Sequence, residues 1–358
     1  MKKNLLLPAV VILLTLSAGR GSKDKPENLV LFIGDGMGVA HVFAGMMHSD
    51  FKMEFPAFPV TGFSITFSLN SKTTDSAAGG TAIATGEKTN NRMISMRPDS
   101  TEIKTLFELA KEKGMSTGIV CTSSLTDATP ATFVTHVMVR NDYYRIAKGY
   151  LSCNADVFIG GGLNHFNKRP DSLDLTMELK KAGYDVVYTL EDFKKSGAKR
   201  VAGLMSGGDM PLISAGRDPE YLAEATAKAI EILSANPKGY VLMVEGSEVD
   251  DGGHNKDLNQ IVDEVTDMDR AVTVARRYAD RRNNTLIVVT ADHETGGMSL
   301  IDGETDGREI NAAFSTGSHT AVMVPVFAYG PGAEAFSGVQ ENTDLFRDFV
   351  RLLSLEKK

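Results

Sequence analysis

LVLFIGDGMG, residues 29–38, is an apolar run that ends in a glycine-rich turn. A continuous apolar run, without the alternation of a half-exposed strand, indicates a strand buried on both faces. Such strands are typical of largely parallel sheets that carry helices on each side. The glycines of the turn let the backbone approach a ligand closely or adopt positive φ values, and Asp35 stands at their centre. The stretch therefore predicts a parallel sheet with a carboxylate at the end of one strand.

Six further strand-like runs continue this pattern along the chain. They span residues 118–121, 156–159, 185–188, 240–244, 286–289 and 324–328. Helical patterns alternate with them, over residues 101–113, 142–152, 171–182, 219–233 and 257–281. In the last of these helices, apolar side chains recur at three- and four-residue steps, which marks one buried face. The alternation predicts a doubly wound α/β fold, in which ligands bind beyond the carboxyl ends of the strands.

Side chains of the types that bind metal ions fall at the ends of predicted strands and in the loops that follow. They are Asp35, Thr129, Glu245, Asp250, His254, Asp292, His293 and His319. Because the carboxyl ends of parallel strands meet at one edge of a sheet, we expect these side chains to gather there. Asp250 and His254 stand one helical turn apart, which sets both on one side of a metal ion. Asp292 and His293 are adjacent, so they reach one ion only from an irregular loop.

Ser76 is the candidate nucleophile. The segment TDSAAGGTA, residues 74–82, places its hydroxyl at a predicted helix start, where unpaired N–H groups and the helix dipole favour negative charge. A serine hydroxyl is a weak nucleophile at neutral pH, and the motifs suggest no Ser-His-Asp arrangement. We therefore expect a metal ion to activate the hydroxyl by lowering its pKa.

Seven motifs resemble those of the alkaline phosphatases in residue type and in order, from about residue 28 to residue 346. They are GDGMG at 34–38, DSAA at 75–78, DATPA at 127–131 with His136 and Arg140, EGS at 245–247, Asp250 with His254, TADHE at 290–294 and GSHT at 317–320. The resemblance implies a first zinc ion on Asp250, His254 and His319. It implies a second zinc ion on Asp35, Asp292 and His293. A magnesium ion would lie on Asp35, Thr129 and Glu245, an all-oxygen set.

The activity that the resemblance implies is hydrolysis of phosphate monoesters through a phosphoserine intermediate on Ser76. Arg140 falls at the phosphate clamp of the family, where a guanidinium matches two phosphate oxygens in a bidentate fork. The family also suggests a homodimer. Its larger members carry a crown insertion at the subunit interface, and this chain is too short for a large one.

Thr129 and Pro130 predict a helix start, with the threonine as N-cap and the proline at the first helical position. This helix would place His136 and Arg140 four residues apart on one face. A role for His136 behind the site and simple packing are both open. A solvated surface arginine is the alternative for Arg140, and His165 is expected to be an ordinary histidine.

Two other functions compete with phosphomonoester hydrolysis. A related phosphodiesterase, sulfatase or phosphonate hydrolase would use a similar zinc pair, and a secreted metal- or phosphate-binding protein would keep the ligands without turnover. Ser76 argues against pure binding, which has no use for a nucleophile. One departure from the family pattern leaves the metal preference of the third site open. Asp251 stands where several members have Lys, His or Trp, and with Asp127 it crowds carboxylates together there.

Residues 1–19 have the composition of a secretory signal peptide, with Lys2 and Lys3, an apolar run over residues 5–16 and small residues at its end. We expect export to the periplasm or the outside of the cell, with an uncleaved membrane anchor as the alternative. Without these residues the formal net charge of −8 becomes −10, because the two lysines are their only charges. An acidic exterior disfavours nucleic acids, which require clustered basic residues.

No linker, repeat or low-complexity run divides the rest, so one catalytic domain over residues 26–358 is expected. Residues 164–218 carry no recognisable motif and are expected to complete the edge of the fold. Cys121 and Cys153 are the only cysteines. A disulfide and two separate buried thiols are both open, because sequence does not fix the Cα separation.

Overall fold

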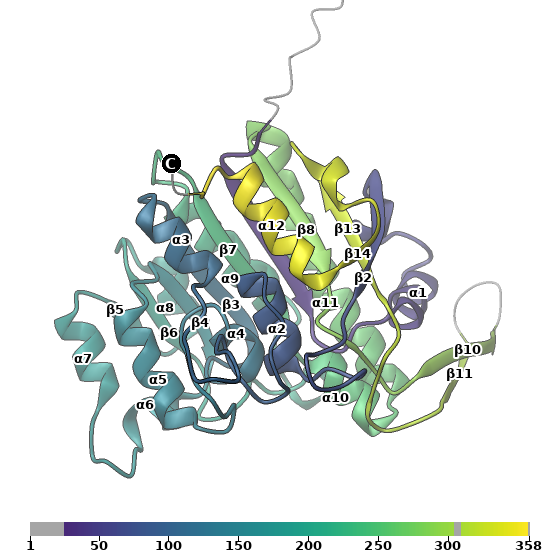
Figure 1. Ribbon diagram of the computed structural model, residues 1–358, viewed down its shortest axis with the longest axis horizontal. Coiled ribbons are helices and arrows are strands. Elements are labelled where there is room, and N and C mark those ends of the chain that lie inside the picture. Colours follow the sequence, from purple (N-terminus) through teal and green to yellow (C-terminus); the bar gives the residue numbers. More distant parts are fainter. Residues whose placement is uncertain (1–24, 304–308, 357–358) are drawn as a thin grey trace, which may run out of the picture.

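A ten-stranded sheet forms the centre of the computed structural model, which describes residues 25–303 and 309–356 (Figure 1). The strand order is β14-β2-β13-β8-β1-β7-β3-β4-β6-β5. In chain order the strands are β1 (Asn28–Gly34), β2 (Val60–Ile65), β3 (Ser116–Ser124), β4 (Val157–Gly161), β5 (Asp185–Val187), β6 (Val201–Leu204), β7 (Tyr240–Gly246), β8 (Thr285–Thr290), β13 (Val324–Tyr329) and β14 (Gly338–Glu341). Every neighbouring pair is parallel except the two that β13 makes with β2 and β8. The predicted, largely parallel sheet is confirmed.

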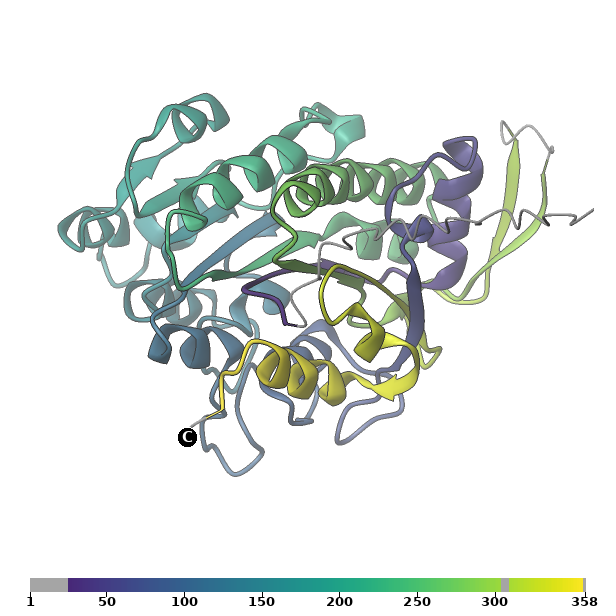
Figure 2. The same cartoon turned by 90° about the horizontal axis from the view of Figure 1, so that it is seen from above.

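Helices cover both faces of the sheet, as Figure 2 shows from above. One face carries α2 (Ser76–Thr85), α3 (Leu106–Glu112), α4 (Ala128–Ala131), α5 (Tyr143–Ser152), α6 (Leu163–Asn167), α7 (Leu175–Lys181) and α12 (Asn342–Leu352). The other carries α1 (Val39–His48), α8 (Leu190–Lys195), α9 (Tyr221–Leu233), α10 (Glu248–Asn255) and α11 (Leu258–Arg282). Alternate residues of β1 supply the two cores, with Leu31 on the first face and Phe32 on the second. This double burial is what the continuous apolar run of β1 predicted.

All seven predicted strands and all five predicted helices are present, with shifted ends. Two helices begin four or five residues later than expected, because Thr105 and Asp174 are the N-caps that accept hydrogen bonds from the first turns of α3 and α7. The sequence missed β2, β6 and β14, which lie toward the sheet edges, where short or half-exposed strands have no continuous apolar run.

The helix predicted from Thr129 and Pro130 is wrong in extent. Its N-cap is Asp127, and α4 ends at Ala131 after a single turn. The following residues Thr132–Thr135 include three β-branched side chains, which lower helix propensity. His136 and Arg140 therefore lie on an irregular segment and share no helical face.

A hairpin of β10 (Met298–Gly303) and β11 (Ile310–Phe314) projects from the body beside α1 (Figures 1 and 2). It joins two short strands, β9 (Glu294–Thr295) and β12 (His319–Thr320), which pair antiparallel and bring His319 beside Thr295. Between β9 and β12 the described part of the chain holds this hairpin. In residues 25–303 and 309–356, no helix is long and apolar enough to cross a membrane.

Candidate active site

Three neighbouring strands bring the carboxylates of the candidate site to one edge of the sheet. β1 lies between β7 and β8, and its Ile33 pairs with Glu245 on one side and with Thr290 on the other. Asp35 and Asp292 follow within two residues of the ends of β1 and β8. Because the three strands are parallel and in register, Asp35, Glu245 and Asp292 lie close together, and all three are buried.

Asp250, His254 and His319 form the first ligand group, with one ligand atom of each within 4.8 Å of the others. The two histidines donate from Nδ1 to backbone carbonyls, of Gly317 and Thr74, each at 2.9 Å. This leaves the two Nε2 atoms, 3.3 Å apart, as the atoms that a cation would join. Without a cation, the hydrogen bond to Asp250 raises the pKa of His254 to about 9, so metal binding would displace a proton.

Asp35, Asp292 and His293 form the second group, and all three are buried. His293 Nε2 lies 3.3 Å from Asp35 Oδ1 and 3.3 Å from Asp292 Oδ2, and neither of these oxygens has a hydrogen-bond partner. Burial lowers the pKa of His293 well below its usual value, so the ring is neutral. Burial and the neighbouring carboxylates raise the pKa of Asp35, and the same causes raise the pKa of Asp292 to about 7.

The third group contains only oxygen ligands, from Asp35, Asp127 and Glu245. Thr129 belongs beside it, because its hydroxyl donates to Asp35 Oδ2 at 3.1 Å. Ser123 donates to Glu245 Oε2 at 3.1 Å, whereas Glu245 Oε1 has no hydrogen-bond partner. Burial, followed by the charge of Asp127, raises the pKa of Glu245 well above its usual value.

These three groups fit divalent cations. Buried carboxylate oxygens without partners are costly, and a cation between them removes that cost. The first two groups combine imidazole nitrogen with carboxylate oxygen, which is a zinc ligand set. The third is all oxygen, which suits magnesium.

Ser76 is the first residue of α2, as expected, and its N-cap is Asp75. The side chain is 2% exposed, at the positive end of the helix dipole. Its Oγ lies 3.2 Å from His293 Nε2.

The geometry around His293 differs from a Ser-His-Asp triad. In a triad the acid binds the ring nitrogen opposite the serine. Here Asp35 and Asp292 face the same Nε2 as Ser76. The opposite nitrogen, Nδ1, is 3.2 Å from the hydroxyl of Thr295, whereas Asp250 Oδ1 lies 3.9 Å from it, beyond hydrogen-bond distance. A hydroxyl and two carboxylates that converge on one imidazole nitrogen are arranged as ligands around a cation.

Arg140 reaches the same point from the irregular segment. Its Nη1 is 3.4 Å from Ser76 Oγ and 3.5 Å from Asp75 Oδ2, and its Nη2 is 3.3 Å from Asp127 Oδ1. Burial opposes its charge, but Asp127, Asp75 and Asp35 raise the pKa of Arg140, so the guanidinium is charged. The side chain is only 23% exposed, which is not the setting of a solvated surface arginine.

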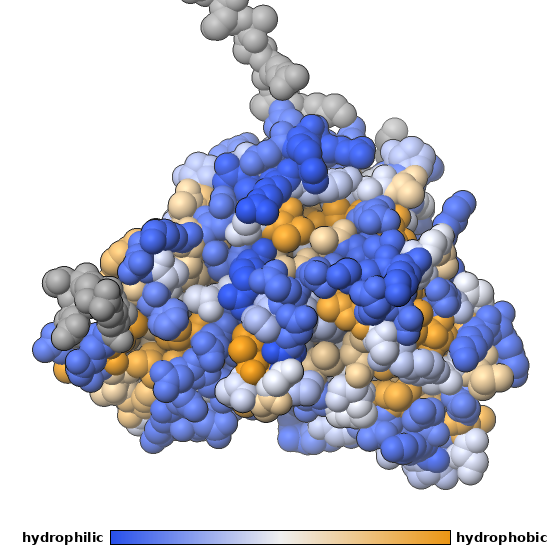
Figure 3. Space-filling model, turned by 180° about the vertical axis from the view of Figure 1, so that it is seen from behind, coloured by the Kyte–Doolittle hydropathy of each residue, from blue (hydrophilic) through white to orange (hydrophobic). Residues whose placement is uncertain are grey.

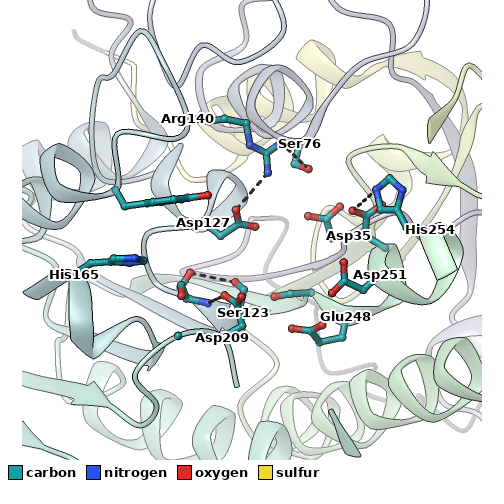
Figure 4. Close-up of a pocket in the computed structure, with 15 residues that line it drawn as sticks. Asp35, Ser76, Ser123, Asp127, Arg140, His165, Asp209, Glu248, Asp251 and His254 are labelled. Atoms are coloured by element: carbon teal, nitrogen blue, oxygen red, sulfur yellow. Dashed lines mark hydrogen bonds and ion pairs between the residues drawn. The ribbon is translucent and has the colours of Figure 1, made fainter. Parts of the chain in front are cut away.

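A cavity of about 460 Å³ opens over these groups (Figure 4). Figure 4 shows Ser76 and Arg140 on one side of it, and Asp209, Glu248 and Asp251 on the other. His254 and His165 lie at opposite ends. The cavity is therefore acidic on the side that faces the serine.

Sequence reasoning missed several residues of this cavity. His165, expected to be ordinary, lines it together with Tyr143, on which its ring stacks with centroids 4.8 Å apart. Asp209 lies in the stretch without a motif and accepts a hydrogen bond from Ser124 N at 2.7 Å. No local signal marks these side chains. Thr295, whose hydroxyl donates a hydrogen bond to Asp250, directly follows the TADHE motif, so its place beside that motif could have indicated it.

The two cysteines are separate thiols. Cys121 is buried in β3, and Cys153 follows the end of α5. The alternative of two unpaired thiols is the one that the structure shows.

Comparisons with known proteins agree with this geometry. The family model described as "Alkaline phosphatase" matches residues 26–313. The chain is 31% identical to alkaline phosphatase 3 of Bacillus subtilis, over 95% of this chain and 91% of the relative. It superposes on the alkaline phosphatase of the Antarctic bacterium TAB5 with a TM-score of 0.88 and 36% identity, over 93% of this chain and 100% of the other. A variant of the TAB5 enzyme with magnesium bound in its M3 site gives the same TM-score and identity, with 99% of its chain covered.

Proposed function

The chain belongs to the alkaline phosphatase family and is an enzyme that hydrolyses phosphate monoesters, and from this premise we propose that Ser76 carries the phosphoryl group as a covalent intermediate. The supporting observation is the position of the Ser76 hydroxyl. It lies at the start of α2, between the Arg140 guanidinium at 3.4 Å and the His293 imidazole at 3.2 Å.

Enzymes of this family depend on metal ions, and we propose two zinc ions and one magnesium ion. Asp250, His254 and His319 would hold the first zinc, and Asp35, Asp292 and His293 the second. Asp35, Thr129 and Glu245 would hold magnesium, with Asp127 beside them. When bound, the metal ions lower the pKa of hydroxyl groups and water and offset the charge of the transferred phosphoryl group.

The protein's own residues account for the remaining steps. Ser76 loses its hydroxyl proton to solvent, and its Oγ forms a bond to phosphorus as the bond from phosphorus to the alcohol oxygen breaks. The alcohol oxygen takes up a proton from solvent and the alcohol leaves. Water then attacks phosphorus and releases inorganic phosphate and the serine hydroxyl. Arg140 pairs with non-bridging phosphate oxygens through its fork, and Asp75 and Asp127 orient that fork. The N-terminus of α2 favours the negative charge on Oγ.

The assay that tests this function compares p-nitrophenyl phosphate with bis(p-nitrophenyl) phosphate and p-nitrophenyl sulfate. We expect kcat/KM to be highest for the monoester, because Arg140 and the all-oxygen group complement its extra charge. A phosphodiesterase or sulfatase would prefer one of the other two substrates. Tight phosphate binding without turnover would identify a binding protein instead.

Asp251 lines the cavity and directly follows Asp250 in the chain. It lies beside Glu248 in the cavity, and the neighbouring Asp209 adds a further carboxylate (Figure 4). We propose that this negative charge strengthens the binding of magnesium in the third group. Magnesium should then activate the enzyme and raise its Tm, because a ligand that binds only the folded state stabilises it.

Asp251→Lys is expected to weaken the magnesium dependence while both zinc sites stay filled. A lysine replaces an attractive charge by a repulsive one, which we expect to shift the magnesium midpoint upward by roughly tenfold. The measurement is a magnesium titration of activity and of Tm after zinc loading, with Asp251→Asn as the neutral control. Identical midpoints in all three proteins would show that Asp251 is only a solvated surface acid.

We propose that the enzyme is a homodimer through the end of the molecule at α1 and the hairpin. Large apolar side chains are exposed there on α1, β2, β10 and the loop of residues 321–323: Val39, Phe43, Phe63, Ile301, Val322 and Met323. Figure 3 shows apolar surface at this end of the molecule. Two shallow cavities of about 610 and 350 Å³ share Val39 and Phe43, so the surface is hollowed as well as apolar. A contiguous exposed apolar surface of this kind favours association.

Phe43→Glu is expected to convert the dimer to a monomer. A buried charge without a partner at the centre of an interface costs several kcal/mol, which raises Kd by on the order of a thousandfold. Light scattering coupled to size exclusion measures the mass. Leu173→Glu is the matched control, since Leu173 is 46% exposed and Phe43 is 43% exposed, but Leu173 lies at the opposite end of the sheet. A dimer that persists in Phe43→Glu would place the interface elsewhere.

We also propose that the chain is exported to the periplasm or beyond, with residues 1–19 as the signal peptide and residues 26–358 as one catalytic domain. The signal segment lies outside the described residues. An acidic exterior and zinc-dependent hydrolysis of small monoesters are compatible with that location.

A further inference from the structure

The segment of residues 132–140, which ends at Arg140, is held by backbone hydrogen bonds to residues 92–95. Ile94 and Val137 exchange both backbone hydrogen bonds, at 2.8 and 2.9 Å. Arg140 N donates to Arg92 O at 2.8 Å. Residues 92–95 therefore form a backbone template that sets where the Arg140 side chain begins.

This template is tied to the helix that carries the nucleophile. Arg92 N donates to Asp75 Oδ2 at 2.9 Å, and Ser95 N donates to the hydroxyl of Thr81 at 2.9 Å. Asp75 is the N-cap of α2, and Thr81 lies within it. Arg92 and Ser95 both have positive φ values, 77° and 48°, so the template keeps a conformation that its surroundings must enforce.

His136 adds two side-chain contacts that hold the segment of residues 132–140. Its Nδ1 lies 3.0 Å from Ser95 O, and its Nε2 lies 3.4 Å from Glu108 Oε1. Both partners only accept hydrogen bonds. A neutral imidazole has one donor, so only the doubly protonated ring satisfies both partners. Glu108 is fixed in turn, because its Oε2 accepts from Thr105 N at 2.7 Å in the capping box of α3.

The groups around His136 determine how easily it loses a proton. Together with the ring they line a cavity of about 620 Å³, and the charged or titratable ones are Glu102, Glu108, Lys111, Glu112 and Cys153. Burial alone would lower the pKa of His136, but the hydrogen bonds to Glu108 and to Ser95 O outweigh it and raise the pKa. A raised pKa means that the contribution of the charged ring is complete at low pH and is lost as the pH rises through the folded-state value.

We propose that His136 is a positioning residue for Arg140. Its doubly protonated ring joins Ser95 and Glu108 and thereby fixes residues 132–140. Arg140 then binds phosphate more tightly, and this binding weakens when the ring loses a proton. This inference rests on the proposed clamp role of Arg140. The ligands concerned are monoester dianions and inorganic phosphate. Product release becomes easier at alkaline pH, because the ring then keeps only one of its two hydrogen bonds.

The test measures KM for p-nitrophenyl phosphate and the inhibition constant of inorganic phosphate from about pH 6 to about pH 10, around the titration range of histidine. The variants are His136→Gln and Glu108→Gln, with His48→Gln on the exposed end of α1 as the control. In the wild type and the control, phosphate binding should weaken through one step assigned to His136. His136→Gln should lack that step and bind phosphate roughly five- to tenfold more weakly at the low-pH end. Glu108→Gln should move the step to lower pH, since glutamine can still accept at the capping box but carries no charge.

An NMR titration of the His136 ring gives the step directly, and it should coincide with the kinetic step. Coincidence supports the proposal, whereas a pH dependence of phosphate binding that is the same in His136→Gln and in the wild type overturns it. If His136→Gln does not fold, the test rests on the shift of the pH step in Glu108→Gln: a shift to lower pH supports the proposal, and an unchanged step overturns it.

A double-mutant cycle separates this inference from the function on which it rests. If His136 acts through Arg140, then His136→Gln should add little to the loss in Arg140→Ala. Full additivity overturns the positioning role. If Arg140→Ala alone leaves phosphate binding unchanged, the proposed clamp fails, although the His136 titration and its shift in Glu108→Gln remain measurable.

Discussion

Ser76→Ala is expected to lower kcat for phosphate monoesters by on the order of 10³-fold or more, with fold and metal content unchanged. The serine is 2% exposed, and alanine removes only its hydroxyl, so the surrounding packing stays intact. The residual rate would come from direct attack of water on the bound ester.

The control for this variant is Ser64→Ala, which removes a hydroxyl at another fully buried serine, in β2. We expect its kcat to equal that of the wild type. Metal content by mass spectrometry and Tm should match in all three proteins. A Ser76→Ala enzyme that turns over at nearly the wild-type rate would rule out the covalent mechanism.

Arg140→Ala is expected to lower kcat/KM for monoesters by roughly 10²- to 10³-fold, and far less for diesters. A diester offers one fewer charged oxygen, so it loses less when the bidentate fork is removed. Arg140→Lys should fall between, because lysine keeps the charge without the planar fork. Arg145→Ala, at an exposed position in the first turn of α5, is the control and should leave both substrates unaffected. Equal losses on monoester and diester would refute the clamp.

The centre of the fold was predictable because burial on both faces is visible in the sequence. The continuous apolar runs predict the strands β1, β7 and β8, which the structure places side by side, and a carboxylate stands at or just beyond the end of each. Parallel strands in register bring Asp35, Glu245 and Asp292 together wherever the rest of the sheet lies. That these three carboxylates gather at one edge of the sheet was therefore predictable, whereas the adjacency and register of β1, β7 and β8 come from the structure.

The edges of the sheet and the wall of the cavity were not predictable in this way. β2, β6 and β14 are short or half exposed, so their pairing depends on the rest of the sheet. Asp209 and His165 reach the cavity from a stretch without a motif, because tertiary packing alone places them there. The prediction of a longer helix after Thr129 was wrong for a related reason. The segment pairs with residues 92–95, a contact that has no local signature.

The sequence also does not predict the direct contact between Ser76 and His293, or which ring nitrogen makes it. The two residues are 217 positions apart, and they meet only because the loop that follows β8 packs against the start of α2. Whether the carboxylates face the same ring nitrogen as the serine or the opposite one decides between a cation site and a histidine base. The sequence does not determine this orientation of the imidazole ring.

The most direct test of the account is to trap the covalent intermediate. The zinc- and magnesium-loaded enzyme would be mixed with a phosphate monoester at acidic to neutral pH, quenched in acid within the turnover time and digested, and the peptides analysed by mass spectrometry. We expect one phosphate, on the peptide that contains Ser76, in the wild type and none in Ser76→Ala. Steady turnover with no phosphate on Ser76 at any quench time, or with phosphate on another residue, would contradict it.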